Sequence, residues 1–243
     1  MSDQVPQPTK RRKWTGWLGA VVAFALKFKL LFSLLTVLGS VFIYGWAFGF
    51  PFAIGFVLIL AIHEMGHVAA LRLKGLPAPP PVFIPFMGAA IFLSRNPQSA
   101  ADEAFVAGGG PVAGWVASAL AAWLFVSTAN PLFGTIAYLG FFLQAFNLIP
   151  ISPLDGGRMV AAVDRRLWWV GLPILAAVVI FIHSFFAVLI AIIIGVEFFA
   201  RVRAPADPRY YQVSARDRIL TLVVWLSLLL LSVLGMVMLQ GVA

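Results

Sequence analysis

The segment from Pro51 to Leu73 reads PFAIGFVLILAIHEMGHVAALRL and decides the fold of the chain. It is long and apolar enough to cross a bilayer as one helix. His63, Glu64 and His67 nevertheless lie within it, where ionisable side chains are costly. Because residues four apart share one face of a helix, His63 and His67 can present both imidazoles to the same ion.

The same three residues form the H-E-x-x-H pattern of zinc hydrolases, in which the glutamate acts as general base. An alternative is that the two histidines and Glu64 form a hydrogen-bonded cluster that packs helices together. A zinc site needs at least one more protein ligand, which the rest of the chain must supply.

Composition places the chain in the membrane, since 62% of its residues are apolar and only 11% are charged. Its length fits a single domain. There is no cysteine, which excludes disulfides and thiolate ligands and leaves histidine and carboxylate as candidate ligands. The net charge of +8 is distributed as a topology signal and does not indicate nucleic-acid binding.

Hydropathy predicts an all-α polytopic membrane protein with about seven transmembrane helices. We divide the long apolar run 167–200 near His183, which we expect to be a turn residue, and we expect Glu197 and Arg201 to form an intrahelical ion pair. The predicted spans are Leu30–Phe50, Pro51–Leu73, Ala104–Ser127, Leu132–Ile149, the two halves of 167–200, and Ile219–Leu239. We expect three parts: a tail and interfacial helix (1–29), a catalytic membrane core (30–166) and accessory helices (167–243).

The basic residues indicate how the chain is oriented. Met1–Lys13 is expected to be a flexible cytosolic tail, and Trp14–Lys29 an interfacial helix. All basic residues fall in the segments predicted to be inside, which predicts an inner amino terminus and an outer carboxyl terminus. They are Lys10, Arg11, Arg12, Lys13, Lys27, Lys29, Arg72, Lys74, Arg95, Arg158, Arg165, Arg166, Arg201, Arg203, Arg209, Arg216 and Arg218.

A proline-rich segment follows the second predicted span. The prolines between Pro77 and Pro85 exclude a helix, yet Val82–Leu93 is too apolar for an ordinary exposed loop. We predict a small membrane-associated β-hairpin or sheet that bends at Met87-Gly88. A packed structural loop and a substrate-contacting element are both open for it.

Small residues mark the third predicted span, which contains Gly108-Gly109-Gly110-Pro111 and Gly114. They favour close helix packing. A kink beside a functional site is the alternative.

A second informative stretch runs from Asn147 to Arg158 and reads NLIPISPLDGGR. Its prolines and diglycine break the fourth helix at its membrane end and expose backbone groups that can line a cavity. Asp155 is the natural third ligand for the two histidines. It could instead cap the helix that follows.

With both motifs in view, the chain resembles the site-2 protease family of intramembrane zinc metalloproteases. The match consists of His63-Glu64-Met65-Gly66-His67 and of the run from Asn147 to Gly157, in the family's order and on alternate membrane helices. The family core corresponds to roughly residues 30–166.

The resemblance implies one Zn²⁺ per chain, held by His63, His67 and Asp155, with Glu64 as catalytic base and Asn147 near the substrate or the oxyanion. It implies an endopeptidase that cuts transmembrane or membrane-proximal segments of other proteins. The loop after the second helix would receive the substrate as an added strand. The expected partners are a transmembrane protein substrate and the lipid bilayer, without nucleic acid, and the sequence carries no signal for an oligomeric state.

Two other functions stay open from the residues alone. Broken helices with histidine and aspartate also build the ion pathways of transporters or metal permeases. A catalytically silent membrane scaffold is the second alternative. We expect a bacterial plasma membrane, because the tail is short and polar and no transit peptide is evident. The chain has no room for the PDZ or nucleotide-sensing domains of some family members, so we expect regulation from elsewhere.

Overall fold

The computed structural model describes residues 14–86, 88–91, 97–205 and 207–241. In these ranges the chain forms eight α-helices and one antiparallel pair of strands, which confirms the predicted all-α class with a small sheet after the second helix. The elements are α1 (Trp14–Phe48), α2 (Phe50–Leu73), β1 (Val82–Ile84), β2 (Gly88–Ala90), α3 (Ala100–Thr128), α4 (Pro131–Asn147), α5 (Asp155–Ala161), the 3-10 helix η1 (Arg165–Leu167), α6 (Trp168–Ile182), α7 (Phe185–Arg203) and α8 (Ala215–Met238). The predicted tail Met1–Lys13, the predicted bend at Met87, the strand end at Phe92-Leu93 and Arg95 lie outside the described residues.

Within the described residues, six helical segments are long and apolar enough to cross a membrane. The fourth predicted span, Leu132–Ile149, corresponds to α4, which has 17 residues. At about 1.5 Å per residue it is roughly 26 Å long, shorter than a typical hydrocarbon core of about 30 Å. It packs against α2, α3 and α8, inside the bundle. The six long segments are Lys27–Phe48, Phe50–Leu73, Ala100–Thr128, Arg165–Ile182, Phe185–Arg203 and Ala215–Met238.

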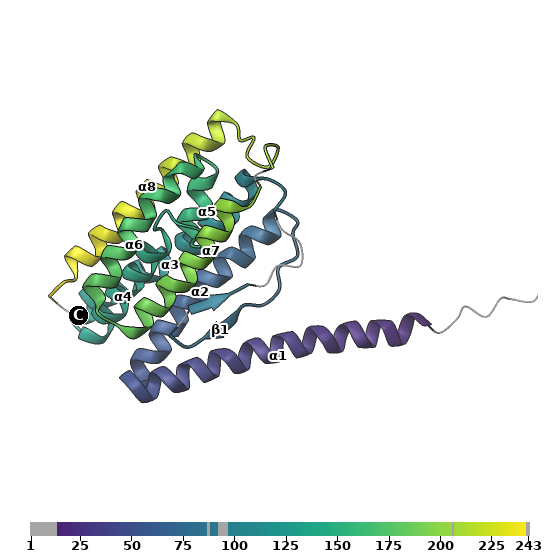
Figure 1. Ribbon diagram of the computed structural model, residues 1–243. Helices are drawn as coiled ribbons and strands as arrows, with labels where there is room; N and C mark the ends of the chain where they lie inside the picture. The colour runs from purple at the N-terminus through teal and green to yellow at the C-terminus, as the bar shows by residue number, and fades with distance from the viewer. Residues whose placement is uncertain (1–13, 87, 92–96, 206, 242–243) are drawn as a thin grey trace, which may run out of the picture.

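Helix α1 is longer than the sequence suggests. The predicted interfacial helix Trp14–Lys29 and the span after it form one continuous helix, because lysine is a good helix former and no glycine or proline separates the two parts. The helix ends at Phe48, and Gly49, with a φ of 92°, turns the chain into α2. The amino-terminal part of α1 runs away from the bundle (Figure 1). The predicted boundary at residues 29 and 30 therefore does not coincide with a helix end.

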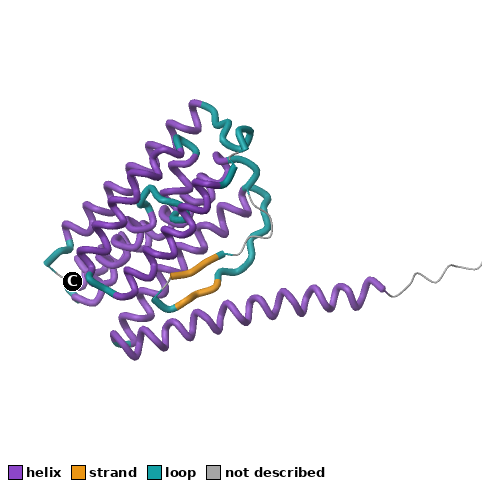
Figure 2. The backbone as a smooth tube through the Cα atoms, in the orientation of Figure 1, coloured by secondary structure: helices purple, strands orange, loops and turns teal. Residues whose placement is uncertain are grey.

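The hairpin joins the carboxyl-terminal half of α1 to the bundle. Val82 pairs with Ala90, and Ile84 pairs with Gly88. β1 packs against α1 and β2 against α2, so the two strands lie between α1 and the helices of the core (Figure 2).

Several basic residues meet at one end of the bundle. Arg165, just before α6, donates a hydrogen bond of 3.0 Å from Nη2 to the main-chain oxygen of Arg201, near the end of α7. Arg218 Nη1, near the start of α8, donates at 2.8 Å to the main-chain oxygen of Val163. These contacts place Arg165, Arg201 and Arg218 near the same end of the bundle.

Two predictions about isolated ionisable residues are confirmed. His183 ends α6 with a φ of 50°, and its side chain is exposed at the turn into α7. Glu197 Oε1 accepts a hydrogen bond of 2.8 Å from Arg201 Nε within α7. Neither residue belongs to the cluster described below.

The glycines of α3 bring its backbone against α2. A Cβ added to Gly66 would overlap the main-chain oxygen of Gly109. Gly110 leaves the space that the His67 ring occupies, and Gly114 leaves the space for the side-chain amide of Gln144. The helix continues through Pro111. The glycine row therefore serves close helix packing, the first of the two interpretations given above.

The chain between α4 and α5 is folded tightly against the start of α5. A Cβ on Gly156 would overlap the main-chain oxygen of Leu148, and one on Gly157 would overlap the main chain of Ile151. The predicted break therefore wraps closely around the diglycine. This packing sets the first residue of α5, Asp155, against α2.

We expect Gly109→Ala to destabilise the protein by about 1–3 kcal/mol, because overpacking a close helix contact forces the backbones apart. A Cβ at this position would lie 2.6 Å from the Gly66 oxygen. Thermal unfolding in detergent micelles measures the change. Gly195→Ala, where the added Cβ has no neighbour within 4 Å, is the matched control. Equal melting temperatures for both variants would contradict the packing role.

Candidate metal centre and active site

Three of the predicted site residues converge on one point. His63 Nε2 and His67 Nε2 are 3.1 Å apart, and each lies 3.2 Å from Asp155 Oδ2. All three residues are buried, with 2%, 7% and 7% of their surface exposed. Helix α2 supplies the histidines from successive turns, and α5 supplies the carboxylate. Among the described residues, these three form the one group of histidine and carboxylate side chains arranged to hold a metal ion.

The opposite nitrogen of each ring has its own partner. His63 Nδ1 lies 2.7 Å from Gln144 Oε1, and His67 Nδ1 lies 2.8 Å from the main-chain oxygen of Val106. The Gln144 amide nitrogen donates to the main-chain oxygen of Gly140, which assigns its oxygen to His63. Since both partners are acceptors, each neutral ring carries its proton on Nδ1 and directs a lone pair from Nε2.

The donor set fits a bound cation. Two imidazole lone pairs and a carboxylate oxygen face one another without a proton between them, which is repulsive unless a positive charge lies among them. Donor atoms that share a tetrahedral zinc ion lie about 3.3 Å apart. The observed separations of 3.1 and 3.2 Å are close to this value. A hydrogen-bonded packing cluster explains the arrangement less well, because neutral rings in these tautomers offer no donor to each other.

Asp155 does not cap its own helix. The residue before α5 is Leu154, and no side-chain cap bond is made there. The Asp155 carboxylate instead points towards the histidines, with Oδ2 in contact with both rings. The ligand interpretation therefore agrees with the geometry better than the capping alternative.

A large cavity opens beside the three side chains. Its volume is about 1120 Å³, and Glu64 and Asn147 line it together with His63, His67 and Asp155. The hairpin, α4, α6 and α7 contribute mostly apolar side chains to its walls, and Tyr44 of α1, Glu103 of α3 and Tyr210 also line it.

The two residues predicted to be catalytic, Glu64 and Asn147, differ in their hydrogen bonds. Glu64 is 6% exposed, and no hydrogen bond joins its carboxylate to another described residue. Asn147 is the last residue of α4, and its Nδ2 donates at 3.0 Å to the main-chain oxygen of Leu143. Asn147 therefore lies on the cavity wall with its side chain bonded to its own helix.

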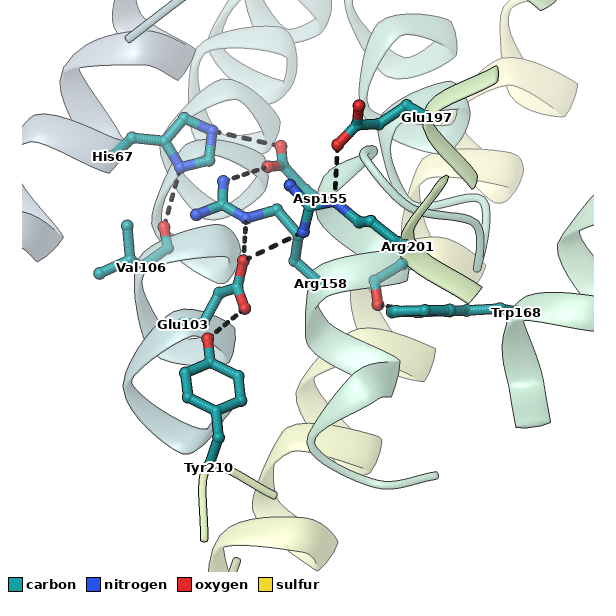
Figure 3. A network of polar contacts seen from close by, with 10 residues as sticks. His67, Glu103, Val106, Asp155, Arg158, Trp168, Glu197, Arg201 and Tyr210 are labelled. Carbon is teal, nitrogen blue, oxygen red and sulfur yellow. Dashed lines mark hydrogen bonds and ion pairs between the residues drawn. The ribbon is translucent and has the colours of Figure 1, made fainter. Parts of the chain in front are cut away.

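A polar network supports the other oxygen of Asp155 (Figure 3). Arg158 Nη1 lies 3.7 Å from Asp155 Oδ1, and Arg158 Nε donates at 3.1 Å to Glu103 Oε1. Glu103 also accepts from the Tyr210 hydroxyl, and Arg201 Nη1 lies 3.9 Å from it. Burial and the adjacent Glu103 carboxylate raise the pKa of Tyr210. The network links α3, α5, α7 and the loop before α8 around the site.

Sequence reasoning missed Gln144, Glu103 and Tyr210. Gln144 is a fully buried amide in an apolar helix, and such a residue signals a buried polar partner. Glu103 directly precedes the third predicted span, and no motif marks it as part of a site. Tyr210 lies in a basic loop, and no local pattern marks it.

We expect Gln144→Met to weaken metal binding by about 10- to 100-fold, since outer partners orient a ligating histidine and raise its basicity. Gln144→Glu keeps an acceptor for His63 Nδ1 and should retain most of the affinity. Competition with a chromophoric chelator measures both values. Gln212→Met, at an exposed position, is the control. An unchanged affinity in Gln144→Met would exclude the supporting role.

The chain is similar to a known protein family over part of its length, and to a solved structure. Residues 127–191 match the model of peptidase family M50, a range that includes Asn147 and Asp155 but not the α2 motif. Among solved structures, the chain is similar to the site-2 protease from Methanocaldococcus jannaschii, with 18% identity, a TM-score of 0.47 and coverage of 74% of this chain and 90% of that one. Curated proteins gave no match. The match to peptidase family M50 covers about a quarter of the chain and lies over the segment that supplies Asn147 and Asp155.

Proposed function

We propose that this protein is an intramembrane zinc endopeptidase that cleaves transmembrane or membrane-proximal segments of other membrane proteins. One observation carries the proposal: two imidazole nitrogens and a carboxylate oxygen meet within 3.2 Å on the wall of a cavity that Glu64 also lines. The match to peptidase family M50 supports the reaction class.

His63, His67 and Asp155 would hold the zinc ion. When bound, zinc supplies Lewis-acid chemistry, because it acidifies water and polarises a carbonyl group. The hydrogen bonds that Gln144 and Val106 accept from the two Nδ1–H groups keep the rings turned so that both Nε2 atoms face Asp155. The protein's contribution is thus a fixed tautomer and a fixed ring orientation at each histidine.

Glu64 would move the protons. It follows His63 directly on α2, and its carboxylate lines the cavity. In the proposed reaction Glu64 takes a proton from the attacking water and later gives a proton to the leaving amine. Asn147, the last residue of α4, would donate an N–H to the negative charge that develops on the carbonyl oxygen of the substrate.

A substrate helix must unwind before its peptide bonds can react, because its carbonyl groups are occupied by helical hydrogen bonds and shielded by lipid. Gly88 and Ala89 of β2 line the same cavity as the catalytic groups. We propose that an unwound substrate segment pairs with this strand, which would hold it extended beside Glu64.

The proposed location is a bacterial plasma membrane with the amino terminus in the cytoplasm. The basic residues that gather at one end of the bundle support this orientation by the positive-inside rule. The proposed site lies at that same end, since Arg158 contacts both Asp155 and Glu103, and Glu103 in turn contacts Arg201.

We expect Glu64→Gln to lower cleavage of a model transmembrane peptide by at least about 100-fold, because it removes the general base. The same variant should keep its metal, since Glu64 is not a proposed ligand. Cleavage is followed by gel or mass spectrometry in detergent or proteoliposomes. Undiminished cleavage would refute the role of Glu64, and loss of metal uptake by cells without a proteolytic defect would favour a transporter.

We expect His67→Ala and Asp155→Ala to lose stoichiometric zinc, because each removes one of three protein ligands. Elemental analysis of the purified variants measures the occupancy. His183→Ala, at the exposed turn between α6 and α7, is the matched control and should keep the full content. Full occupancy in Asp155→Ala would show that the carboxylate is not a ligand.

A further inference from the structure

Hydroxyl groups of α1 bind the outer edge of the hairpin. Ser33 Oγ donates at 2.6 Å to the main-chain oxygen of Pro81, and the Phe83 main-chain N–H donates at 3.1 Å to Thr36 Oγ1. The edge of a strand exposes main-chain donors and acceptors, which are costly to leave unpaired in an apolar environment. At this edge, side chains of a helix take the place of a neighbouring strand.

The contact continues along α1 to the turn of the hairpin. The Tyr44 hydroxyl accepts from the Phe86 main-chain N–H at 2.8 Å, and the two rings meet edge to face at 5.1 Å. Phe86 has a φ of 63°, a conformation that non-glycine residues seldom adopt without support. Its ring also stacks on Phe186 at the start of α7, with centroids 4.8 Å apart.

The hydroxyl residues share one face of α1. Ser33, Thr36, Ser40 and Tyr44 follow one another at intervals of three or four, which places them in one row along a helix. Ser33, Ser40 and Tyr44 are buried, and the Ser40 hydroxyl has no partner in the described part of the chain. The row therefore faces the hairpin side of α1, whereas the other faces are mostly apolar and exposed.

The strand register identifies which main-chain groups stay free. Since the Phe83 N–H points to Thr36, the pair Phe83 and Ala89 does not exchange hydrogen bonds within the hairpin. In an antiparallel ladder the N–H and C=O of Ala89 must then point away from β1. Ala89 lines the cavity beside the catalytic groups.

We propose that Ser33, Thr36 and Tyr44 of α1 are positioning residues: they occupy the β1 edge and thereby leave the main chain of Ala89, on the β2 edge, as the place where an extended substrate segment pairs. The proposal rests on the proposed peptidase function for the substrate, but the occupied edge is a property of the free protein. The hydroxyls of Ser33, Thr36 and Tyr44 bond to the hairpin and not to the metal ligands, so they act through the hairpin, and the Tyr44 side chain also lines the cavity.

Hydrogen–deuterium exchange of the full chain in nanodiscs tests the occupied edge without a substrate. In Thr36→Val and Tyr44→Phe, we expect the amides of Phe83 and Phe86 respectively to exchange at least about tenfold faster, since each loses its acceptor. Thr128→Val, which removes a hydroxyl bonded within its own helix, and Tyr138→Phe are matched controls and should leave the hairpin unchanged. Unchanged exchange in both test variants would overturn the proposal.

Peptidase kinetics test the consequence for substrate. We expect each variant to raise the KM for a model transmembrane peptide by about two- to tenfold, the effect of one hydrogen bond, with kcat within about twofold of wild type. Zinc content and the melting temperature should match wild type, which separates positioning from a folding defect. A fall in kcat with unchanged KM would overturn the proposal.

Ala89→Pro tests the free edge itself, because proline removes the N–H that would pair with the substrate. We expect its KM to rise at least about tenfold while zinc content is retained. An unchanged KM would overturn the assignment of Ala89. If the wild type cleaves no model peptide, the peptidase function fails, whereas the exchange measurement still decides whether α1 hydroxyls hold the hairpin.

Discussion

The close contact between the backbones of α2 and α3 is the constraint on which the site depends. Gly66 and Gly109 meet without side chains between them, and Gly110 leaves the space for the His67 ring. At this distance the Val106 main-chain oxygen can accept a hydrogen bond from His67 Nδ1. Glycine in a helix interior is intrinsically unfavourable by about 1 kcal/mol relative to alanine. Here it permits a polar contact that a larger residue would exclude.

A second close packing sets the carboxylate. The chain after α4 folds back on Gly156 and Gly157, so α5 begins against α2 and Asp155 reaches both rings. The Arg158 guanidinium then compensates charge on the side of Asp155 that faces away from the histidines, and Glu103 holds Arg158 in place. Close backbone contacts therefore determine where the site residues lie, and the charged side chains add further support. Two distant segments supply its groups, and α3 and α4 hold them in register.

Sequence alone predicted most of the fold because hydropathy and proline or glycine breaks act locally. The α2 motif, the break before Asp155 and the hairpin after Pro81 were all visible in short windows. The length of α1 was misjudged, since Lys27 and Lys29 suggested an interface although neither residue ends a helix. Gln144 and Tyr210 were missed for a different reason: each meets its partner across many residues of sequence, and such pairing depends on how helices pack.

The acceptor of His67 has a consequence for how this protein can vary. The oxygen belongs to the main chain of Val106, so no side-chain replacement at that position deletes it. Alanine scanning would therefore report on the packing of the buried Val106 side chain and not on this hydrogen bond, and another apolar residue there could keep the same ring orientation. One of the two hydrogen bonds that orient the imidazoles thus depends on the path of the α3 backbone and not on the side chain of residue 106.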